Sequence, residues 1–218
     1  MRIMVAAFAL LSVFFLSAEN EHAQQKSPVR IGGPCEDCEL MYEGMPADLH
    51  WETNIAASSE PGEPLEISGT ILQPDGKTPA PGVVLYVYHT DARGHYAPSP
   101  NQTHARRHGR LRGWMKTNQH GQYKFRTIKP ASYPSQTIEA HIHATVKEPN
   151  IPEYYVDDFL FDDDPLLTAE KRRRLANRGG SGIMTLHRNS KGTLIGQRTI
   201  VLGRNIPGYE TASVKKGK

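Results

Sequence analysis

Hydrophobic and polar residues alternate along much of the chain from residue 65 onward. In the segment 83–89, Val84, Tyr86 and Tyr88 alternate with Leu85 and Val87. Successive side chains of a strand point to opposite faces, so a period of two with aromatic and β-branched residues predicts a strand. The same pattern predicts strands at 65–72, 113–117, 122–128, 138–146, 159–161, 183–186 and 193–202.

Turn residues separate these segments, and one segment between them has the pattern of a helix. Asp164 is suited to cap a helix over 165–178, with Pro165 in its first turn and Gly179-Gly180 at its end. Short strands with frequent turns are typical of an antiparallel β-sandwich. We therefore predict an all-β fold, an antiparallel β-sandwich with long loops and one short helix.

The amino-terminal segment has the layout of a signal peptide. Arg2 supplies a positive charge, the run from Met4 to Leu16 is almost wholly apolar, and small residues follow. We expect cleavage after Ala18, with Ala23 as the alternative site. The apolar run is short for a membrane span, and no span is expected in the mature protein. The sequence thus predicts an exported protein, periplasmic or extracellular.

Four parts are expected along the chain. They are a signal peptide (1–18), an amino-terminal arm (19–61), a β-sandwich domain (62–205) and a tail (206–218). The arm holds both cysteines, Cys35 and Cys38, with two residues between them. In an exported protein this spacing favours a structural disulfide. A redox pair would need a βαβ context and a zinc site would need two more ligands, and neither is evident.

Composition narrows the function classes. The chain has 218 residues and a formal net charge of +3. That charge is too small, and too poorly matched with aromatic residues, to indicate a nucleic-acid partner. An oligomer is compatible with the sequence.

The candidate chemistry centres on His141 and His143. Two histidines at positions i and i+2 lie on the same face of a strand and can bind one metal. Tyr133 precedes them in Ala-Ser-Tyr-Pro, and Tyr96 ends the segment that begins at Tyr86. A tyrosine oxygen could complete such a site.

The order of these motifs resembles the intradiol ring-cleavage dioxygenases, the superfamily of protocatechuate 3,4-dioxygenase and catechol 1,2-dioxygenase. The resemblance rests on Asp-X-X-Gly-X-Tyr at 91–96, on the Thr-X-X-X-Gly-X-Tyr-X-Phe-X-Thr-Ile-X-Pro-X-X-Tyr-Pro pattern at 117–134 and on His-Ile-His at 141–143. It continues through the acidic stretch 161–165 and covers roughly residues 62–203.

The resemblance implies one non-haem Fe(III) per chain, bound by Tyr96, Tyr133, His141 and His143. Phenolate oxygen is a hard anionic donor that suits a ferric ion, and the ion would lower the phenol pKa from its usual value of about 10. Tyr133 matches the tyrosine that leaves the metal when substrate binds. The implied reaction cleaves a catechol-type diol with O2 to a muconate-type diacid. Tyr123, in contrast, is expected to pack in the sheet.

Two positions depart from the family pattern and leave the substrate unassigned. Ile138 stands where the family usually has an arginine, and Asp158 falls near the family's glutamine. The loop at 98–112 is rich in arginine and histidine, and its arginines could supply charge instead. Of the loop arginines we take Arg112 as a candidate substrate-binding residue, and we add Asp158 as a second candidate.

Two other functions remain open from the residues. A binding module like transthyretin or the carboxypeptidase regulatory domain would explain residues 65–128, but it leaves Tyr133 and the histidine pair without a role. A copper- or zinc-binding β-sandwich would use the histidine pair. It would want further histidines such as His89 or His187, and it leaves the tyrosines unused.

Overall fold

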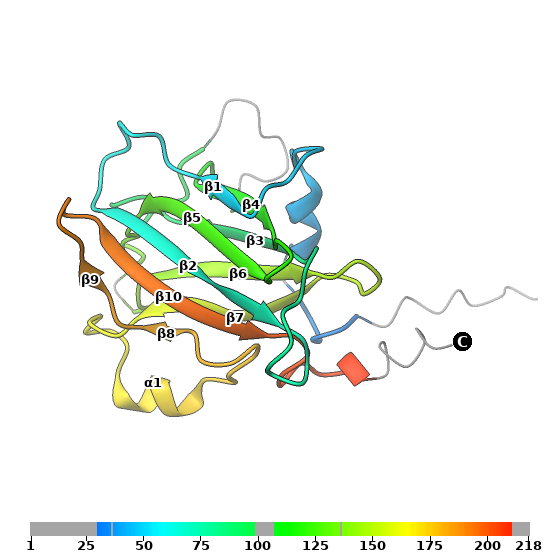
Figure 1. Ribbon diagram of the computed structural model, residues 1–218. Coiled ribbons are helices and arrows are strands. Elements are labelled where there is room, and N and C mark those ends of the chain that lie inside the picture. Colours follow the sequence, from blue (N-terminus) through cyan, green and yellow to red (C-terminus); the bar gives the residue numbers. More distant parts are fainter. Residues whose placement is uncertain (1–29, 36, 99–106, 136, 211–218) are drawn as a thin grey trace, which may run out of the picture.

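The computed structural model describes residues 30–35, 37–98, 107–135 and 137–210. Two β-sheets pack face to face, and one short helix lies below them in Figure 1. The strands are β1 (Glu52–Asn54), β2 (Pro64–Leu72), β3 (Val84–His89), β4 (Arg112–Lys116), β5 (Gln122–Ile128), β6 (His141–Lys147), β7 (Tyr154–Phe161), β8 (Ile183–Met184), β9 (His187–Arg188) and β10 (Leu194–Val201). The predicted all-β sandwich is confirmed.

The pairing within the sheets corrects one part of the prediction. The described strands have the orders β1-β5-β2-β10-β9 and β4-β3-β6-β7-β8. Three pairs are parallel, namely β1 with β5, β2 with β10 and β7 with β8. The sheets are therefore mixed rather than wholly antiparallel. Side-chain alternation is the same in both kinds of strand, so hydrophobic patterning could not distinguish them.

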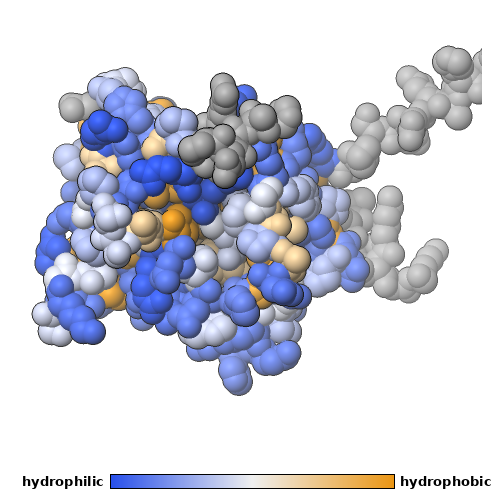
Figure 2. All heavy atoms as spheres, turned by 90° about the horizontal axis from the view of Figure 1, so that it is seen from above, coloured by the Kyte–Doolittle hydropathy of each residue, from blue (hydrophilic) through white to orange (hydrophobic). Residues whose placement is uncertain are grey.

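The core lies between the two sheets. Leu85 and Val87 of β3 meet Ile67, Phe125 and other buried residues of the opposite sheet in one hydrophobic cluster. Tyr123 is fully buried and its hydroxyl donates to the Arg198 carbonyl, 2.8 Å away, as its place in the sheet predicted. Burial of such large side chains is the main force that holds the sheets together. Seen from above, hydrophilic residues cover most of the surface and hydrophobic residues show near its centre (Figure 2).

Part of the amino-terminal arm is built into the sandwich. Strand β1 extends one sheet, and a 3₁₀ helix, η1 (Cys38–Tyr42), lies beside the other. Cys35 and Cys38 form a disulfide at the start of η1. The predicted signal peptide and most of the predicted tail lie outside the described residues. No described helix is long and apolar enough to cross a membrane.

The helix is shorter than predicted. Helix α1 spans Ala169–Arg174, and Thr168 caps it by accepting from the Lys171 amide at 3.3 Å. Asp164 accepts from the Leu166 amide, as a cap would, but residues 165–168 form turns and the helix begins only at Ala169. Its second carboxylate oxygen accepts from the Ala140 amide. The helix ends at Leu175, whose backbone is extended, and so stops before the two glycines. Asp164 instead holds the chain that enters β6.

Candidate metal centre

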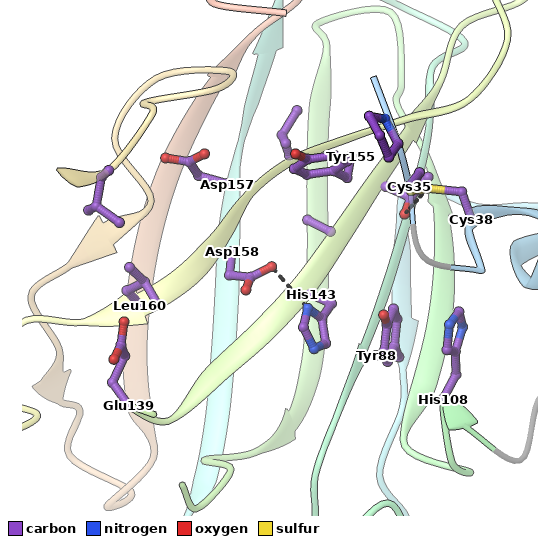
Figure 3. A pocket seen from close by; sticks show the side chains of 15 residues that line it. Cys35, Cys38, Tyr88, His108, Glu139, His143, Tyr155, Asp157, Asp158 and Leu160 are labelled. Carbon is purple, nitrogen blue, oxygen red and sulfur yellow. Dashed lines mark hydrogen bonds and ion pairs between the residues drawn. A yellow bond between two sulfur atoms is a disulfide. The ribbon is translucent and has the colours of Figure 1, made fainter. Parts of the chain in front are cut away.

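The predicted histidine pair lies on β6 at an irregularity of the sheet. His143 pairs with Tyr88 of β3 on one side, while the register with β7 shifts between Ile142 and Ala144. Two residues of β7, Asp157 and Asp158, therefore face the single position of His143. Such bulges re-aim side chains beside functional sites. Here Asp158 Oδ1 comes within 3.1 Å of His143 Nδ1 (Figure 3).

Hydrogen bonds to the outer nitrogens fix the orientation of both imidazoles. His141 Nδ1 lies 2.7 Å from the Glu139 carbonyl, which can only accept, so Nδ1 carries the proton. His143 Nδ1 donates in the same way to the Asp158 carboxylate. Burial lowers the pKa of His141, which favours its neutral ring. In the neutral rings each Nε2 then carries a lone pair, the arrangement typical of metal-binding histidines.

Asp158 is held as a carboxylate by its partner. Burial alone would raise the pKa of this side chain. The hydrogen bond from His143, together with the positive charge that His143 and His141 carry when protonated and that of Arg198, outweighs burial, so the pKa of Asp158 lies below its usual value. The predicted candidate Asp158 thus lies in the site, in contact with His143. This contact orients the imidazole.

The two predicted tyrosines come from loops that are tied together. Asp91 accepts from the amides of Arg93 and His95, which shapes the turn before Tyr96. The same turn bonds the chain before Tyr133, because the Ala131 amide donates to the Asp91 carbonyl at 3.2 Å. Tyr96 Oη and Tyr133 Oη consequently lie 2.7 Å apart.

The structure brings all four predicted ligands to one point. Tyr96 Oη is 2.9 Å from His143 Nε2, Tyr133 Oη is 3.3 Å from His141 Nε2, and the two Nε2 atoms are 3.1 Å apart. Two phenol protons can fill only two of these four contacts, so the other two bring lone pairs against each other. Donors about 2 Å from a shared ion lie about 3 Å from one another, as these do. The donor set therefore fits a metal cation.

Two neighbouring rings that sequence reasoning did not assign complete the surroundings. Tyr88 stands between His143 and His108 (Figure 3), with ring centroids 4.5 Å and 3.7 Å away. Burial lowers the pKa of His108 to about 4, so its ring is neutral at physiological pH. We call Tyr88, His108 and His143 the ring stack. The register of β3 against β6 could have indicated Tyr88, but His108 lies in a loop without a period.

Two cavities flank the ring stack and share its three residues. The first has a volume of 420 Å³ and reaches Glu139, Asp158 and the Cys35–Cys38 disulfide. The second has a volume of 290 Å³ and is lined by Tyr96 and Tyr133, by the ring stack, and by Asp37 and Arg107. A small planar molecule can therefore approach the four-donor cluster from the arm side of the sheet.

Arg112 lies elsewhere and does not line either cavity. Its guanidinium donates to the Glu43 carbonyl at 2.8 Å and to the Leu40 carbonyl at 3.5 Å. It also lies over the Trp114 ring, 5.3 Å from its centroid. Arg112 is the first residue of β4, and its side chain is directed toward the arm. In this structure Arg112 anchors the arm, and its substrate-binding role stays a prediction that these contacts do not support.

The other departures from the family pattern are also visible. Ile138 is 45% exposed and does not line either cavity. Because isoleucine is uncharged, this position does not supply the positive charge of the family's arginine. His89 is buried and bonded to the Thr90 carbonyl and to Thr127, while His187 is exposed on β9. Neither histidine joins the pair on β6, as a copper or zinc site would want. The part of the arginine-rich loop at 99–106 lies outside the described residues.

Comparison with known proteins agrees with this geometry. The sequence model of the family Dioxygenase_C, described as Dioxygenase, matches residues 41–176, more than half of the chain. Catechol 1,2-dioxygenase 1 of Acinetobacter lwoffii is 40% identical over 74 residues, which cover 34% of this chain and 23% of that protein. Catechol 1,2-dioxygenase of Acinetobacter baylyi is 30% identical over 110 residues, which cover 50% of this chain and 33% of that protein. The chain thus spans a third or less of these two relatives.

Solved structures agree on the fold. The dioxygenase domain of a dioxygenase–carbohydrate-binding protein fusion from Streptomyces sp. SirexAA-E aligns with a TM-score of 0.54 and 26% identity, over 73% of this chain and 94% of that one. Catechol 1,2-dioxygenase from Acinetobacter sp. ADP1 aligns with a TM-score of 0.51 and 22% identity, over 70% of this chain and 57% of that one. The family match and these likenesses show that the chain belongs to the intradiol ring-cleavage dioxygenases.

Proposed function

We propose that this protein is a non-haem Fe(III) dioxygenase that cleaves catechol-type diols between their two hydroxyl-bearing carbons. The observation that carries the proposal is the convergence of Tyr96, Tyr133, His141 and His143, with both Nε2 lone pairs directed inward. Two imidazoles and two phenol oxygens form a hard donor set. A tetrahedral zinc site built from histidine and cysteine would not use the phenols.

The metal would be held by these four side chains. Bound there, a ferric ion would act as a Lewis acid and template that activates the diol toward O2. Asp158 and the Glu139 carbonyl hold the protons on the Nδ1 atoms, and so keep both Nε2 atoms available. Tyr133 Oη, beside Tyr96 Oη at 2.7 Å, is placed to accept a proton from an incoming hydroxyl group. Tyr88 stacks on one side of His143, and His108 stacks behind Tyr88.

The reaction balances without a further reductant. The muconate-type diacid contains every atom of the catechol together with both atoms of one O2 molecule. One carbon–carbon bond and the O–O bond break, and each of the two carbons gains an oxygen. The protein therefore needs to bind the diol, orient it and take up its protons, while no nicotinamide or flavin site is required.

The test is metal content, colour and oxygen incorporation in purified protein. Iron-loaded protein should contain about one iron per chain, as a single four-ligand site implies, and should show a visible tyrosinate-to-iron absorption. Incubation with catechol under isotopically labelled O2 should give a diacid that carries both labelled oxygens. Colourless protein after ferric loading, together with no diacid from any simple catechol, would contradict the proposal.

A pair of tyrosine variants makes the test specific. Tyr133→Phe removes one donor oxygen and should alter the visible absorption and abolish most turnover. Tyr42→Phe removes an exposed phenol that bonds Glu153 on the surface, and it should leave both unchanged. If the two variants behave alike, Tyr133 is not part of the iron site.

A further inference from the structure

The bulge in β7 leaves two consecutive residues without partners on β6. The described pairs of these strands stop at Phe159 and resume at Val156. Asp157 and Asp158, which lie between, have no partner in that register. Figure 3 shows Asp158 directed toward His143, while the side chain of Asp157 points away from it. The direction of Asp158, and with it the orientation of the His143 imidazole, therefore depends on what holds the backbone of this bulge.

Arg198 reaches this bulge from the opposite sheet. It lies on β10, and its Nη1 donates to the Asp157 carbonyl at 2.6 Å. Its guanidinium also lies over Phe159, 4.6 Å from the ring centroid. Arg198 thus contacts the residues on both sides of Asp158. The Asp157 amide donates to the Arg178 carbonyl at 3.1 Å, so both backbone groups of Asp157 are bonded to residues outside β6.

The backbone of Arg198 is fixed by close packing in its own sheet. The Tyr123 hydroxyl donates to the Arg198 carbonyl at 2.8 Å. Gly69 leaves the space for this bond, because a β-carbon there would lie 1.8 Å from the same carbonyl oxygen and 2.7 Å from the Tyr123 hydroxyl. Arg198 is therefore presented to the bulge from a tightly packed part of the fold.

Packing alone does not account for an arginine at this position. Arg198 is 4% exposed, and its Nε and Nη2 atoms are buried without a hydrogen-bond partner in the described part of the chain. Burial disfavours its charge, although the carboxylates of Asp157 and Asp158 favour it. Replacement of buried charged groups by apolar side chains of similar volume is often neutral or stabilising. The contacts of Arg198 with the bulge are what an apolar residue could not supply.

We propose that Arg198 is a positioning residue of the metal centre, which holds the bulge of β7 so that the Asp158 carboxylate faces His143 Nδ1. The inference rests on the proposed function, since it concerns the same site. Asp158 keeps the proton on Nδ1, and the Nε2 lone pair then stays available to a metal. Without the guanidinium, the Asp157 carbonyl loses its bond and the bulge can shift. Asp158 then holds the imidazole less firmly, and the proton can move to Nε2.

The decisive measurement is the tautomer of His143 in metal-free protein, read from imidazole nitrogen chemical shifts at mildly alkaline pH. The wild type should carry the proton on Nδ1. Arg198→Met fills the same space without the donors, and it should raise the population with the proton on Nε2. It should also lower iron affinity about tenfold, the size typical when the partner of a metal-binding histidine is disturbed. An unchanged tautomer together with a lower unfolding free energy would assign Arg198 a structural role only, and would overturn the inference.

Three further variants make the test specific. Arg126→Met removes the same charge from an exposed ion pair with Glu66 in the same sheet, and it should leave the tautomer and the iron affinity unchanged. Arg198→Lys keeps a charged donor and should restore part of the iron affinity. If Arg198→Met does not fold, Arg198→Gln gives the same comparison, because its neutral side chain is too short to bond the Asp157 carbonyl.

The tautomer also separates this inference from the proposed function. It is read without iron and without a diol, so a shift in Arg198→Met supports the inference even if the protein cleaves no catechol. Cleavage of catechol by the wild type, combined with a wild-type tautomer in Arg198→Met, would leave the proposed function standing and refute the positioning role.

Discussion

Gly94 lies against the backbone of Ser132 so closely that a β-carbon at Gly94 would lie 2.0 Å from the Ser132 carbonyl oxygen. Gly94 also has a φ of 80°, which only glycine adopts without strain. These two residues belong to the loops that carry Tyr96 and Tyr133. The close contact therefore sets the spacing between the two phenol oxygens.

Replacement of Gly94 by alanine should separate the tyrosine loops. The left-handed backbone costs about 1–2 kcal/mol by itself, and the clash with Ser132 adds to that. We expect a lower urea midpoint and loss of bound iron, measured by metal analysis. Gly82→Ala is the matched control, because Gly82 has a φ of 75° but no atom within 4 Å of an added β-carbon. Full iron content in Gly94→Ala would show that the loop contact does not set the site.

Asp158→Ala should weaken metal binding without removing a predicted ligand. The His143 imidazole would lose the acceptor that fixes its Nδ1 proton, and changes of this kind typically cost about 10–100-fold in metal affinity. Asp158→Asn keeps an acceptor oxygen and should lose less. Competition with a chelator measures both affinities. Asp163→Asn, which alters an exposed carboxylate paired with Lys129, should match the wild type.

Arg112→Ala should loosen the arm. Arg112 is buried, and its charged hydrogen bonds to the carbonyls of Glu43 and Leu40 are worth about 2–3 kcal/mol in total. We expect a matching loss of unfolding free energy in urea and faster amide exchange at residues 38–45. Arg174→Ala, which breaks an exposed pair, should cost less than about 1 kcal/mol. Unchanged amide exchange in the arm would contradict the anchoring role of Arg112.

Protonation linked to His89 should lower the free energy of unfolding in mild acid. Burial lowers the pKa of His89 to about 4, below its ordinary value of 6.5. The unfolded chain therefore binds a proton first as pH falls, so stability is full above pH 6.5 and is lost between pH 6.5 and 4. The loss amounts to about 3 kcal/mol, from about 1.36 kcal/mol per pKa unit.

A variant isolates this contribution. His89→Gln removes the titration, so the difference in unfolding free energy between wild type and variant should shrink as pH falls from about 7 to about 4. Urea unfolding at several pH values measures that difference. A constant difference across this range would show that His89 is not the group responsible.

Much of the site could be predicted because strand geometry fixes it locally. His141 and His143 share a face by alternation alone, and Tyr123 was expected in the sheet. Tyr96 and Tyr133 came from the family resemblance, and the structure brings both to the histidine pair. Asp158 was a candidate by position, and the bulge in β7 gives it a role as a partner of His143.

The remaining features depend on contacts that no local pattern encodes. Arg112 resembled the other loop arginines in the sequence, but the fold turns it to the arm carbonyls. Helix α1 begins after Thr168 rather than after Asp164, because residues 165–168 form turns beside Asp164, whose carboxylate also bonds the Ala140 amide. Alternation predicted most of the strands, but it missed β1, β9 and the first half of β7. It also gave no sign of the parallel partners of β2 and β5, since the direction of a neighbouring strand does not affect a strand's own alternation.

The parallel pairing of β2 with β10 has a consequence for synthesis. β10 supplies eight consecutive partners, from Leu194 to Val201, to a strand that begins at Pro64. A nascent chain cannot close this sheet until Leu194–Val201 have left the ribosome, long after β2 has done so. Such distant pairing favours slow folding, and it leaves β2 without this partner, and open to chaperones, while the segments between β2 and β10 are made.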